Sequence, residues 1–205
     1  MKQKTKYKSI LIAVSAMYAA LLVGGKEALA VLPNIEVVTL LIAVCAYVWG
    51  PIVVFPAVNV FIAVDMAIWG VNTWIISYLI HWNTVAVIFW LLGRVHFKRK
   101  VTEIVVATAV AVAVTTVFGV LTSAVDTLVG YTGKGFFVDF DNVLYRFGLM
   151  YGSGVTFFVT QILCNLVLFT AVFDPLVKLN RKAQLRMLPS PEQPQAEQTE
   201  DEQSN

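Results

Sequence analysis

Long apolar stretches constrain this chain more than any other feature of its sequence. A helix needs about 20 mostly apolar residues to cross the hydrocarbon core of a bilayer. Six stretches approach that length, and chain breakers such as Gly50-Pro51 separate them. The sequence therefore predicts an all-α integral membrane protein with six transmembrane helices, at residues 8–31, 35–50, 51–72, 73–94, 101–129 and 146–178.

Composition supports this fold class. Hydrophobic residues make up 58% of the 205 residues, whereas about 45–50% is typical of soluble domains. The first stretch also resembles a secretory signal, because Ala28-Leu29-Ala30 has the pattern of a cleavage site. Lys26 and Glu27 stand directly before that pattern and no soluble domain follows it. We therefore expect the first stretch to be a spanning helix.

Clustered basic residues predict the orientation in the membrane. The net charge is only +2, so the clusters indicate topology and not nucleic-acid binding. With six spans, all three clusters fall on one side, which the positive-inside rule identifies as the cytoplasm. We expect both termini in the cytoplasm and the polar loops outside. The clusters are at residues 2–8, 94–100 and 178–186, and the outer loops are at 25–35, 70–74 and 130–145.

The C-terminal end has a different composition from the rest of the chain. From Pro189 onward it is rich in proline, glutamine and glutamate and has no apolar periodicity. Such a segment cannot bury enough apolar surface to offset its ordering entropy. We therefore predict a six-helix membrane domain at residues 1–186 and a disordered, acidic cytoplasmic tail at residues 187–205.

Motifs for nucleotide binding, metal binding and catalysis are missing. The sequences GGKE and TGKG lack the spacing of a phosphate-binding loop. Cys45 and Cys164 have no metal-ligand spacing to each other or to the histidines. We expect no catalytic residues, no metal and no ATPase activity of its own. Two alternatives remain: a membrane enzyme acting on lipid at the outer leaflet through Glu36, Asp65 or Asp139, and a structural subunit that tolerates their replacement.

Ionisable residues inside the apolar stretches are the first candidates for a binding site. A charge at the bilayer centre costs about 2.5–3.5 kcal/mol on insertion scales, so Glu36 is a functional hypothesis by default. The structural alternative is a helix cap, with Asn34 as the capping residue and Glu36 near the positive end of the helix. Asp65, Trp69 and Asn72 lie on one stripe of the third predicted helix. We expect that stripe to face the outer site.

Aromatic and polar residues also gather at the outer ends of the later helices. The segment at 130–146 combines glycines with aromatic and charged side chains, and it looks like a lid over a small-molecule pocket. A solvated loop and an aromatic belt at the bilayer surface are the alternatives. The candidate substrate-binding residues are Asn34, Glu36, Asp65, Trp69, Asn72, Tyr78, Phe137, Asp139, Asn142, Tyr145 and Arg146.

Small residues in the first predicted helix have the spacing of a helix contact. Ala16 and Ala20 are four residues apart, which lets another helix approach closely. Spacing alone fits packing within this chain and contact with a partner protein equally well.

Taken together, Ala16-x-x-x-Ala20, LPNIEVVTLL at 32–41 and GFFVDFDN before the last stretch resemble the S components of energy-coupling factor (ECF) vitamin transporters. The resemblance covers residues 8–182. It implies a substrate-binding subunit of an ABC-type importer in a bacterial plasma membrane. It also implies a transmembrane coupling subunit and two cytoplasmic ATPases as partners, contact of Ala16 and Ala20 with the coupling subunit, and toppling of the S component in the bilayer during transport.

The expected ligand follows from the same resemblance. LPNIE is most similar to the cobalamin-specific branch of these S components, which implies cobalamin (vitamin B12) as the substrate. Pantothenate or another water-soluble vitamin is the alternative. A carboxylate ligand would need a fixed cation, and only Lys26 and Arg146 are well placed for one on the predicted outer side.

Overall fold

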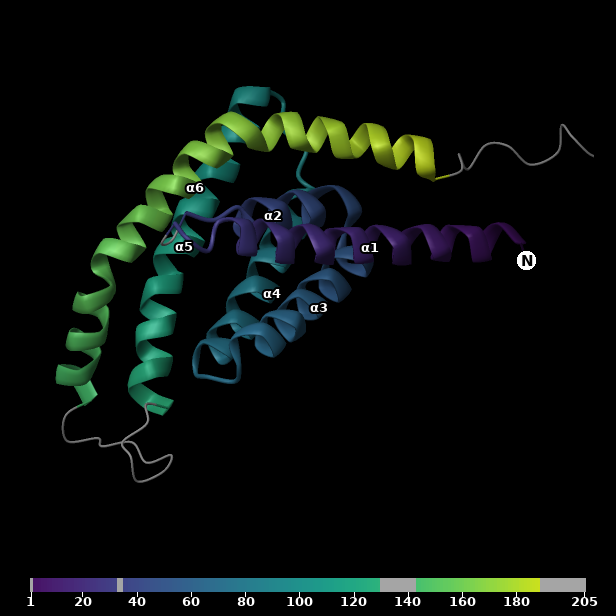
Figure 1. Cartoon of the computed structure of the whole chain (residues 1–205). Helices are drawn as coiled ribbons and strands as arrows, with labels where there is room; N and C mark the ends of the chain where they lie inside the picture. The colour runs from purple at the N-terminus through teal and green to yellow at the C-terminus, as the bar shows by residue number, and fades with distance from the viewer. Residues whose placement is uncertain (1, 33–34, 130–142, 189–205) are drawn as a thin grey trace, which may run out of the picture.

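The computed structural model of the chain describes residues 2–32, 35–129 and 143–188. Every regular element in that part of the chain is a helix, which confirms the all-α fold class. In Figure 1, α3 and α4 lie together below α1, and α5 and α6 lie together to its left. The helices are α1 (Lys2–Ala28), α2 (Val38–Trp49), α3 (Pro51–Trp69), α4 (Trp74–Leu92), α5 (Lys100–Val129) and α6 (Val143–Met187).

Five of these helices are long and apolar enough to cross a membrane, and α2 is the exception. With 12 residues it is about 18 Å long, against about 30 Å for the hydrocarbon core. The predicted helix at 35–50 is therefore too long. The chain still forms turns up to Ile35, and the helix ends where Gly50 adopts a φ of 76°. Pro51 then starts α3, where its missing N–H costs nothing.

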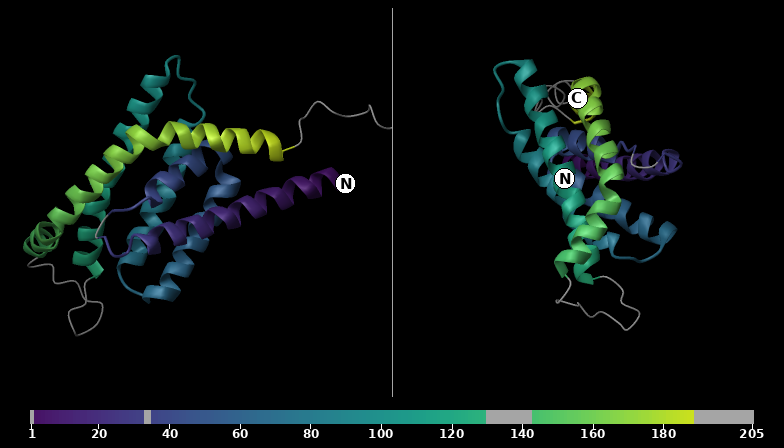
Figure 2. Two further views of the ribbon diagram at one scale, coloured as in Figure 1. Left: turned by 45° about the horizontal axis from the view of Figure 1, so that its top comes forward. Right: turned by 90° about the vertical axis from the view of Figure 1, so that its left-hand side faces the viewer.

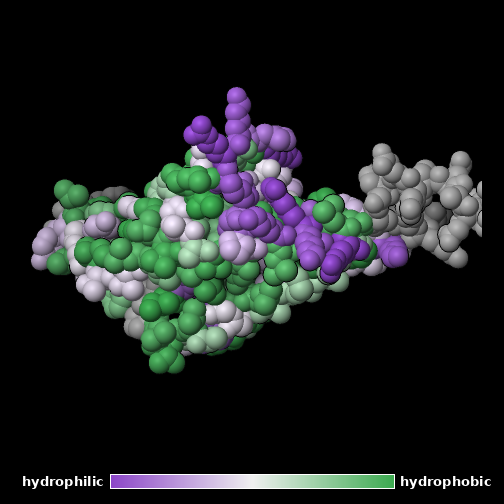
Figure 3. Space-filling view, turned by 90° about the horizontal axis from the view of Figure 1, so that it is seen from above, coloured by the Kyte–Doolittle hydropathy of each residue, from purple (hydrophilic) through white to green (hydrophobic). Residues whose placement is uncertain are grey.

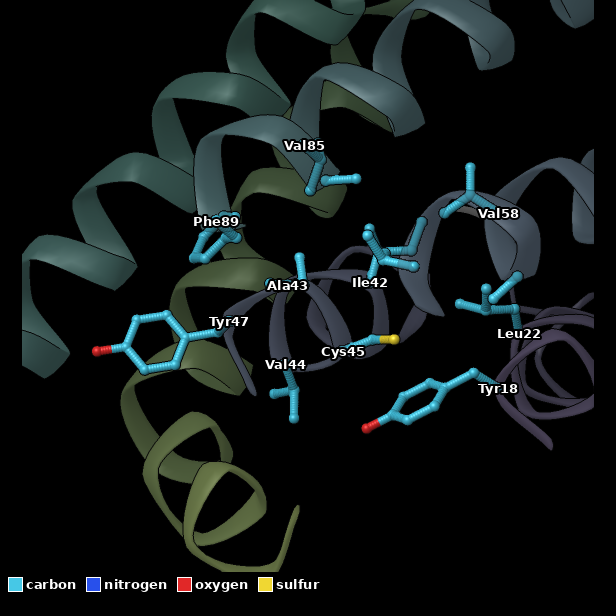
Figure 4. Close-up of a cluster of buried hydrophobic side chains, with 14 of the residues drawn as sticks. Tyr18, Leu22, Ile42, Ala43, Val44, Cys45, Tyr47, Val58, Val85 and Phe89 are labelled. Carbon is cyan, nitrogen blue, oxygen red and sulfur yellow. The ribbon is translucent and has the colours of Figure 1, made fainter. Parts of the chain in front are cut away.

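The short helix α2 forms the centre of the molecule. Ten of its residues are buried, on every side of the helix, as expected for a helix that is apolar all round. Figure 4 shows Ile42 and Val44 of α2 among Leu22 of α1, Val58 of α3 and Phe89 of α4. Because α1, α3, α4 and α6 all pack around it, α2 fixes their positions relative to one another.

A glycine allows the end of α4 to approach the end of α2. A Cβ atom on Gly93 would lie 2.5 Å from the backbone oxygen of Tyr47 and 3.1 Å from its Cα atom. Only a residue without a side chain fits this contact. The sequence does not reveal such a requirement, because it arises from two segments more than 40 residues apart in the chain.

The last helix, α6, is much longer than a membrane span needs. It has 45 residues and contains Pro175, which removes one backbone hydrogen bond and favours a kink. Figure 1 shows α6 running alongside α5 and then bending over the core. Figure 2 shows its C-terminal end and the N-terminus of α1 projecting on the same side of the molecule.

Basic residues from two distant segments meet at what we call the basic end, residues 94–100 and 174–186. Lys100 pairs with Asp174 at 2.7 Å, and the guanidinium of Arg181 lies 5.5 Å from the ring centroid of Tyr47. Figure 3 looks down on this end and shows its hydrophilic side chains gathered on an otherwise largely hydrophobic surface. Two of the three basic clusters seen in the sequence therefore lie together.

Candidate functional site

A cavity of about 160 Å³ lies at the end of the bundle opposite the basic end. Helix α2 begins at this cavity and ends at the basic end, so the two features are separated by the length of α2. All six described helices and the α1–α2 connection contribute to its wall. The lining residues are Lys26, Leu29, Ala30, Leu32, Ile35, Glu36, Val38, Phe61, Tyr78, Trp82, Phe118 and Gln161.

One side of the cavity is made of irregular backbone. After α1, the chain forms single turns, with hydrogen bonds from the backbone N–H of Leu29 to the oxygen of Lys26 and from Leu32 to Leu29. Non-helical backbone is tolerated at membrane depth only where protein covers it or where it lines a wet cavity. The break between α1 and α2 therefore places side chains and irregular backbone in the cavity wall.

The carboxylate of Glu36 stands directly before α2 and accepts hydrogen bonds from neutral groups. The backbone N–H of Thr39 donates to its Oε2 atom at 3.0 Å, and the Thr39 hydroxyl donates to Oε1. From α6, the Asn165 amide donates to Oε1 at 3.1 Å and the Gln161 amide lies at 3.5 Å. Glu36 thus precedes the helix, whereas the predicted helix at 35–50 includes it, and it binds the free N–H group of Thr39 in the first turn.

Asp65 faces α1 and forms an ion pair with Lys26. Both carboxylate oxygens of Asp65 accept hydrogen bonds from the Lys26 ammonium group, and Asp65 is only 2% exposed. One turn further along α3, the indole N–H of Trp69 donates to Glu27 at 2.9 Å. Asp65 and Trp69 thus join the ends of α1 and α3, and neither lines the cavity that we expected their stripe to face.

Aromatic rings form the wall opposite the α1–α2 connection. Trp82 and Phe118 stack with their centroids 5.9 Å apart, and Tyr78 lies edge-on to Trp82 at 5.6 Å. The Lys26 ammonium lies 5.2 Å from the Tyr78 ring centroid and 5.4 Å from that of Trp74, within the range of a cation–π interaction. Packing between α4 and α5 holds these rings in place.

Two buried polar atoms at the cavity have no hydrogen-bond partner in the described part of the chain. The indole N–H of Trp82 belongs to the cavity wall, and the Oδ1 atom of Asn165 belongs to the amide that donates to Glu36. Buried polar groups are normally satisfied, so each of these two atoms calls for an explanation. Functional sites are where proteins tolerate these local deficits.

Of the predicted substrate-binding residues that the structure describes, two, Glu36 and Tyr78, line the cavity. Asp65 reaches it indirectly, through Lys26. Asn72 lies in the turn between α3 and α4, where its Oδ1 atom accepts a hydrogen bond from the backbone N–H of Thr73. Trp69, Asn72, Tyr145 and Arg146 are absent from the cavity wall, and Asn34, Phe137, Asp139 and Asn142 lie outside the described residues.

Sequence reasoning missed the residues that α6 and α1 contribute. Gln161 and Asn165 are buried amides four residues apart in an apolar helix, and that spacing on one helical face was a usable signal. Polar residues at such positions usually have partners or a function. Lys26 drew attention only as an outer cation, and nothing in the sequence connects it with Asp65.

The two alanines of α1 lie on a second surface feature, an apolar groove of about 430 Å³ between α1 and α3. Ala16 and Ala20 are both exposed and line this groove together with Pro56 and Val60 of α3. Neither alanine is covered by another helix of the chain in its described part. The groove therefore offers an open, close-approach surface at these alanines.

In the residues that the structure describes, no group of three histidine, cysteine or acidic side chains is arranged to hold a metal ion. Comparison with protein-family models, with curated proteins and with solved structures gave no match to this chain.

Proposed function

We propose that this protein is the substrate-binding S component of an ECF-type vitamin importer, with six membrane segments and both termini in the cytoplasm. The observation that carries the proposal is the cavity at one end of an apolar bundle, with a carboxylate, an ion-paired lysine and aromatic rings in its wall. Cavities with apolar and aromatic walls and a few polar groups are typical of small-molecule sites.

Topology supports this function. By the positive-inside rule, the basic end faces the cytoplasm in this proposal. The cavity, at the opposite end of the bundle, then faces outward. A partial helix such as α2 at the centre of a bundle, with irregular backbone beside a ligand site, is a recurrent feature of membrane transporters. The chain would capture its ligand outside, and partner subunits would supply ATP hydrolysis for transport.

The groove between α1 and α3 supports association with a coupling subunit. Small residues let helices pack closely in a membrane, where interhelical contact depends on van der Waals packing. Because Ala16 and Ala20 are exposed in an apolar groove, a helix of the coupling subunit could lie against them. Two ATPases bound to that subunit would complete the importer.

The ligand is a water-soluble vitamin in this proposal. Cobalamin remains a candidate, but it would require the cavity to open well beyond about 160 Å³, because pockets for drug-sized ligands already measure about 300–1,000 Å³. Pantothenate would bring a carboxylate next to Glu36. The cavity as it stands favours a smaller ligand than cobalamin.

Two measurements test the proposal together. The protein is purified from its native membrane with a C-terminal tag, and copurifying proteins are assayed for ATPase activity. The isolated chain is then titrated with cobalamin, pantothenate and other vitamins by calorimetry. Submicromolar binding of one vitamin and copurification of ATPases support the importer subunit, whereas absence of both returns the structural-subunit and membrane-enzyme alternatives.

Substitution in the groove separates docking from ligand capture. Ala16→Trp should prevent copurification of the ATPases and leave vitamin binding to the isolated protein intact, because the groove is distinct from the cavity. Ala13→Trp is the matched control, since Ala13 is exposed on α1 and does not line the groove. Equal effects of both substitutions would exclude a specific role of the groove.

A further inference from the structure

Glu36 lacks a positively charged partner, although it lies in the wall of a largely apolar cavity. Its carboxylate bonds to the backbone and hydroxyl of Thr39 and to the amide of Asn165, which are all neutral donors. No ion pair in the described part of the chain includes Glu36. Neutral hydrogen bonds hold the carboxylate in position, but they leave its full negative charge uncompensated.

Lys26, the one basic residue in the cavity wall, is already neutralised. Its ammonium group donates to both carboxylate oxygens of Asp65 and lies over the rings of Trp74 and Tyr78. An anionic ligand would have to compete with Asp65 for this cation. The geometry therefore makes Lys26 a poor receptor for an anion.

Two further carboxylates lie at the same end of the bundle as the cavity. Glu27 accepts from the Trp69 indole and Asp126 accepts from the Thr73 hydroxyl, so both have neutral partners. Arg146, at the start of α6, is a cation that forms no ion pair within the described residues. Among the described residues, carboxylates still outnumber cations at this end, and a net negative charge attracts cations and repels anions.

The aromatic wall suits the same kind of ligand. Phe61, Trp82 and Phe118 line the cavity from three different helices, and Trp82 and Phe118 stack in the same cavity wall that holds Glu36. Aromatic faces attract cations, most strongly where water is excluded, and they also stack on flat rings. Lys26 already demonstrates cation binding to the neighbouring Tyr78 ring.

We propose that the ligand of this cavity is a small organic cation with a flat, aromatic body, whose positive charge lies against Glu36. This inference rests on the proposed binding function and names its substrate class. The body of the ligand contacts the rings of Trp82 and Phe118, and the Gln161 amide offers a hydrogen bond beside the charge. Glu36 is then a ligand-binding residue, and the amide of Asn165 positions it.

Three ligands of nearly the same shape test the proposal: 1-methylnicotinamide, a cation; nicotinamide, which is neutral; and nicotinate, an anion. Calorimetry on the full chain in detergent should give binding of the cation about tenfold tighter than that of the neutral amide, the equivalent of one desolvated charge contact. Nicotinate should bind weakest. Raising the salt concentration should reduce the difference between the three ligands.

Two variants test the role of Glu36 directly. Glu36→Gln keeps the shape of the side chain and should reduce the preference for the cation to about one. Gln161→Lys places a positive charge beside Glu36 and should abolish the preference for the cation, because the lysine would neutralise the carboxylate. Glu103→Gln is the matched control at the basic end, and it should leave the preference unchanged. Thermal unfolding of each variant shows that it is folded.

The outcomes are separable from those of the proposed function. Preference for nicotinate, equal binding of all three ligands, or no binding of 1-methylnicotinamide at millimolar concentration would overturn the cation proposal. If an anionic vitamin then binds and the ATPases copurify, the importer function stands without it. If the cation binds through Glu36 but no ATPase copurifies, the site is correct and the transport role fails.

Discussion

The two ends of the molecule treat their carboxylates differently. At the basic end, Glu103 lies 2.9 Å from Lys100, and Asp174 lies 2.7 Å from both Lys100 and Lys178. At the cavity, Glu36 has only neutral partners. The carboxylates at the basic end thus each have a lysine partner, and one of these pairs joins α5 to α6, whereas the carboxylate in the cavity wall has none.

In the proposed function, this difference separates ion pairs that hold helices together from a carboxylate that binds a ligand. A buried carboxylate is expensive unless a cation compensates it, so an unmatched one persists where it has another use. Ion pairs at the basic end join helices, and so does the Lys26–Asp65 pair beside the cavity. Only Glu36 lies in the wall of a cavity without a charged partner. The predictions below test whether its environment differs in kind from that of the other carboxylates.

The largest expected effect comes from Asp65→Asn. It leaves Lys26 half-buried without its counter-charge, so the free energy of unfolding should fall by about 3 kcal/mol, as for other broken buried pairs. Unfolding in detergent, followed by tryptophan fluorescence, measures this change. The double variant with Lys26→Met should recover most of the loss. A double variant less stable than Asp65→Asn alone would mean that Lys26 has a separate stabilising role.

Gly93→Ala should destabilise the basic end by packing alone. The added methyl group would meet the backbone of Tyr47, which cannot move without shifting α2, so the free energy of unfolding should fall by about 2 kcal/mol. Gly24→Ala is the control, because nothing lies within 4 Å of its added methyl group. That change should raise stability by about 0.5–1 kcal/mol, the usual gain for alanine in a helix. Equal effects of the two changes would exclude the close α2–α4 contact.

Glu103→Gln should lower the free energy of unfolding by about 1 kcal/mol. The amide oxygen can still accept from the Tyr47 hydroxyl, and Lys100 keeps its second partner, Asp174. Urea or thermal unfolding measures the loss, and Lys178→Gln, on the exposed side of the same network, should cost less. A larger loss for Lys178→Gln would place the stabilising charge contact at the exposed lysine.

The helices themselves were largely predictable from the sequence. Apolar stretches and breakers gave the start of α3 at Pro51 and the end of α5 at Val129, because these boundaries depend on local chemistry. The length of α2 was not predictable in the same way. Residues 35–37 are compatible with a helix, but Glu36 bonds across to α6 and the helix begins only at Val38.

The candidate site was predictable only in part, for a physical reason. Glu36 and Tyr78 were recognisable because a charge or an aromatic ring in an apolar stretch stands out locally. The pairing of Lys26 with Asp65 depends on how α1 packs on α3, and sequence spacing carries no information on it. Gln161 and Asn165 are an intermediate case. Their spacing on one helical face is a local signal, but the sequence does not indicate that both amides contact Glu36.

The smallest effect on stability, and the sharpest contrast between the two ends, should come from Glu36→Gln. A glutamine retains the oxygen that accepts from Thr39 and removes a charge that no cation compensates. The free energy of unfolding should therefore stay within about 0.5 kcal/mol of the wild type or rise slightly, as is common when a binding residue is replaced. The same variant should lose the stabilisation that a bound cation provides, measured as the shift of the unfolding temperature with 1-methylnicotinamide. A loss of stability as large as that of Asp65→Asn would mean that Glu36 is a structural residue, and that both ends of the molecule use their carboxylates to hold helices together.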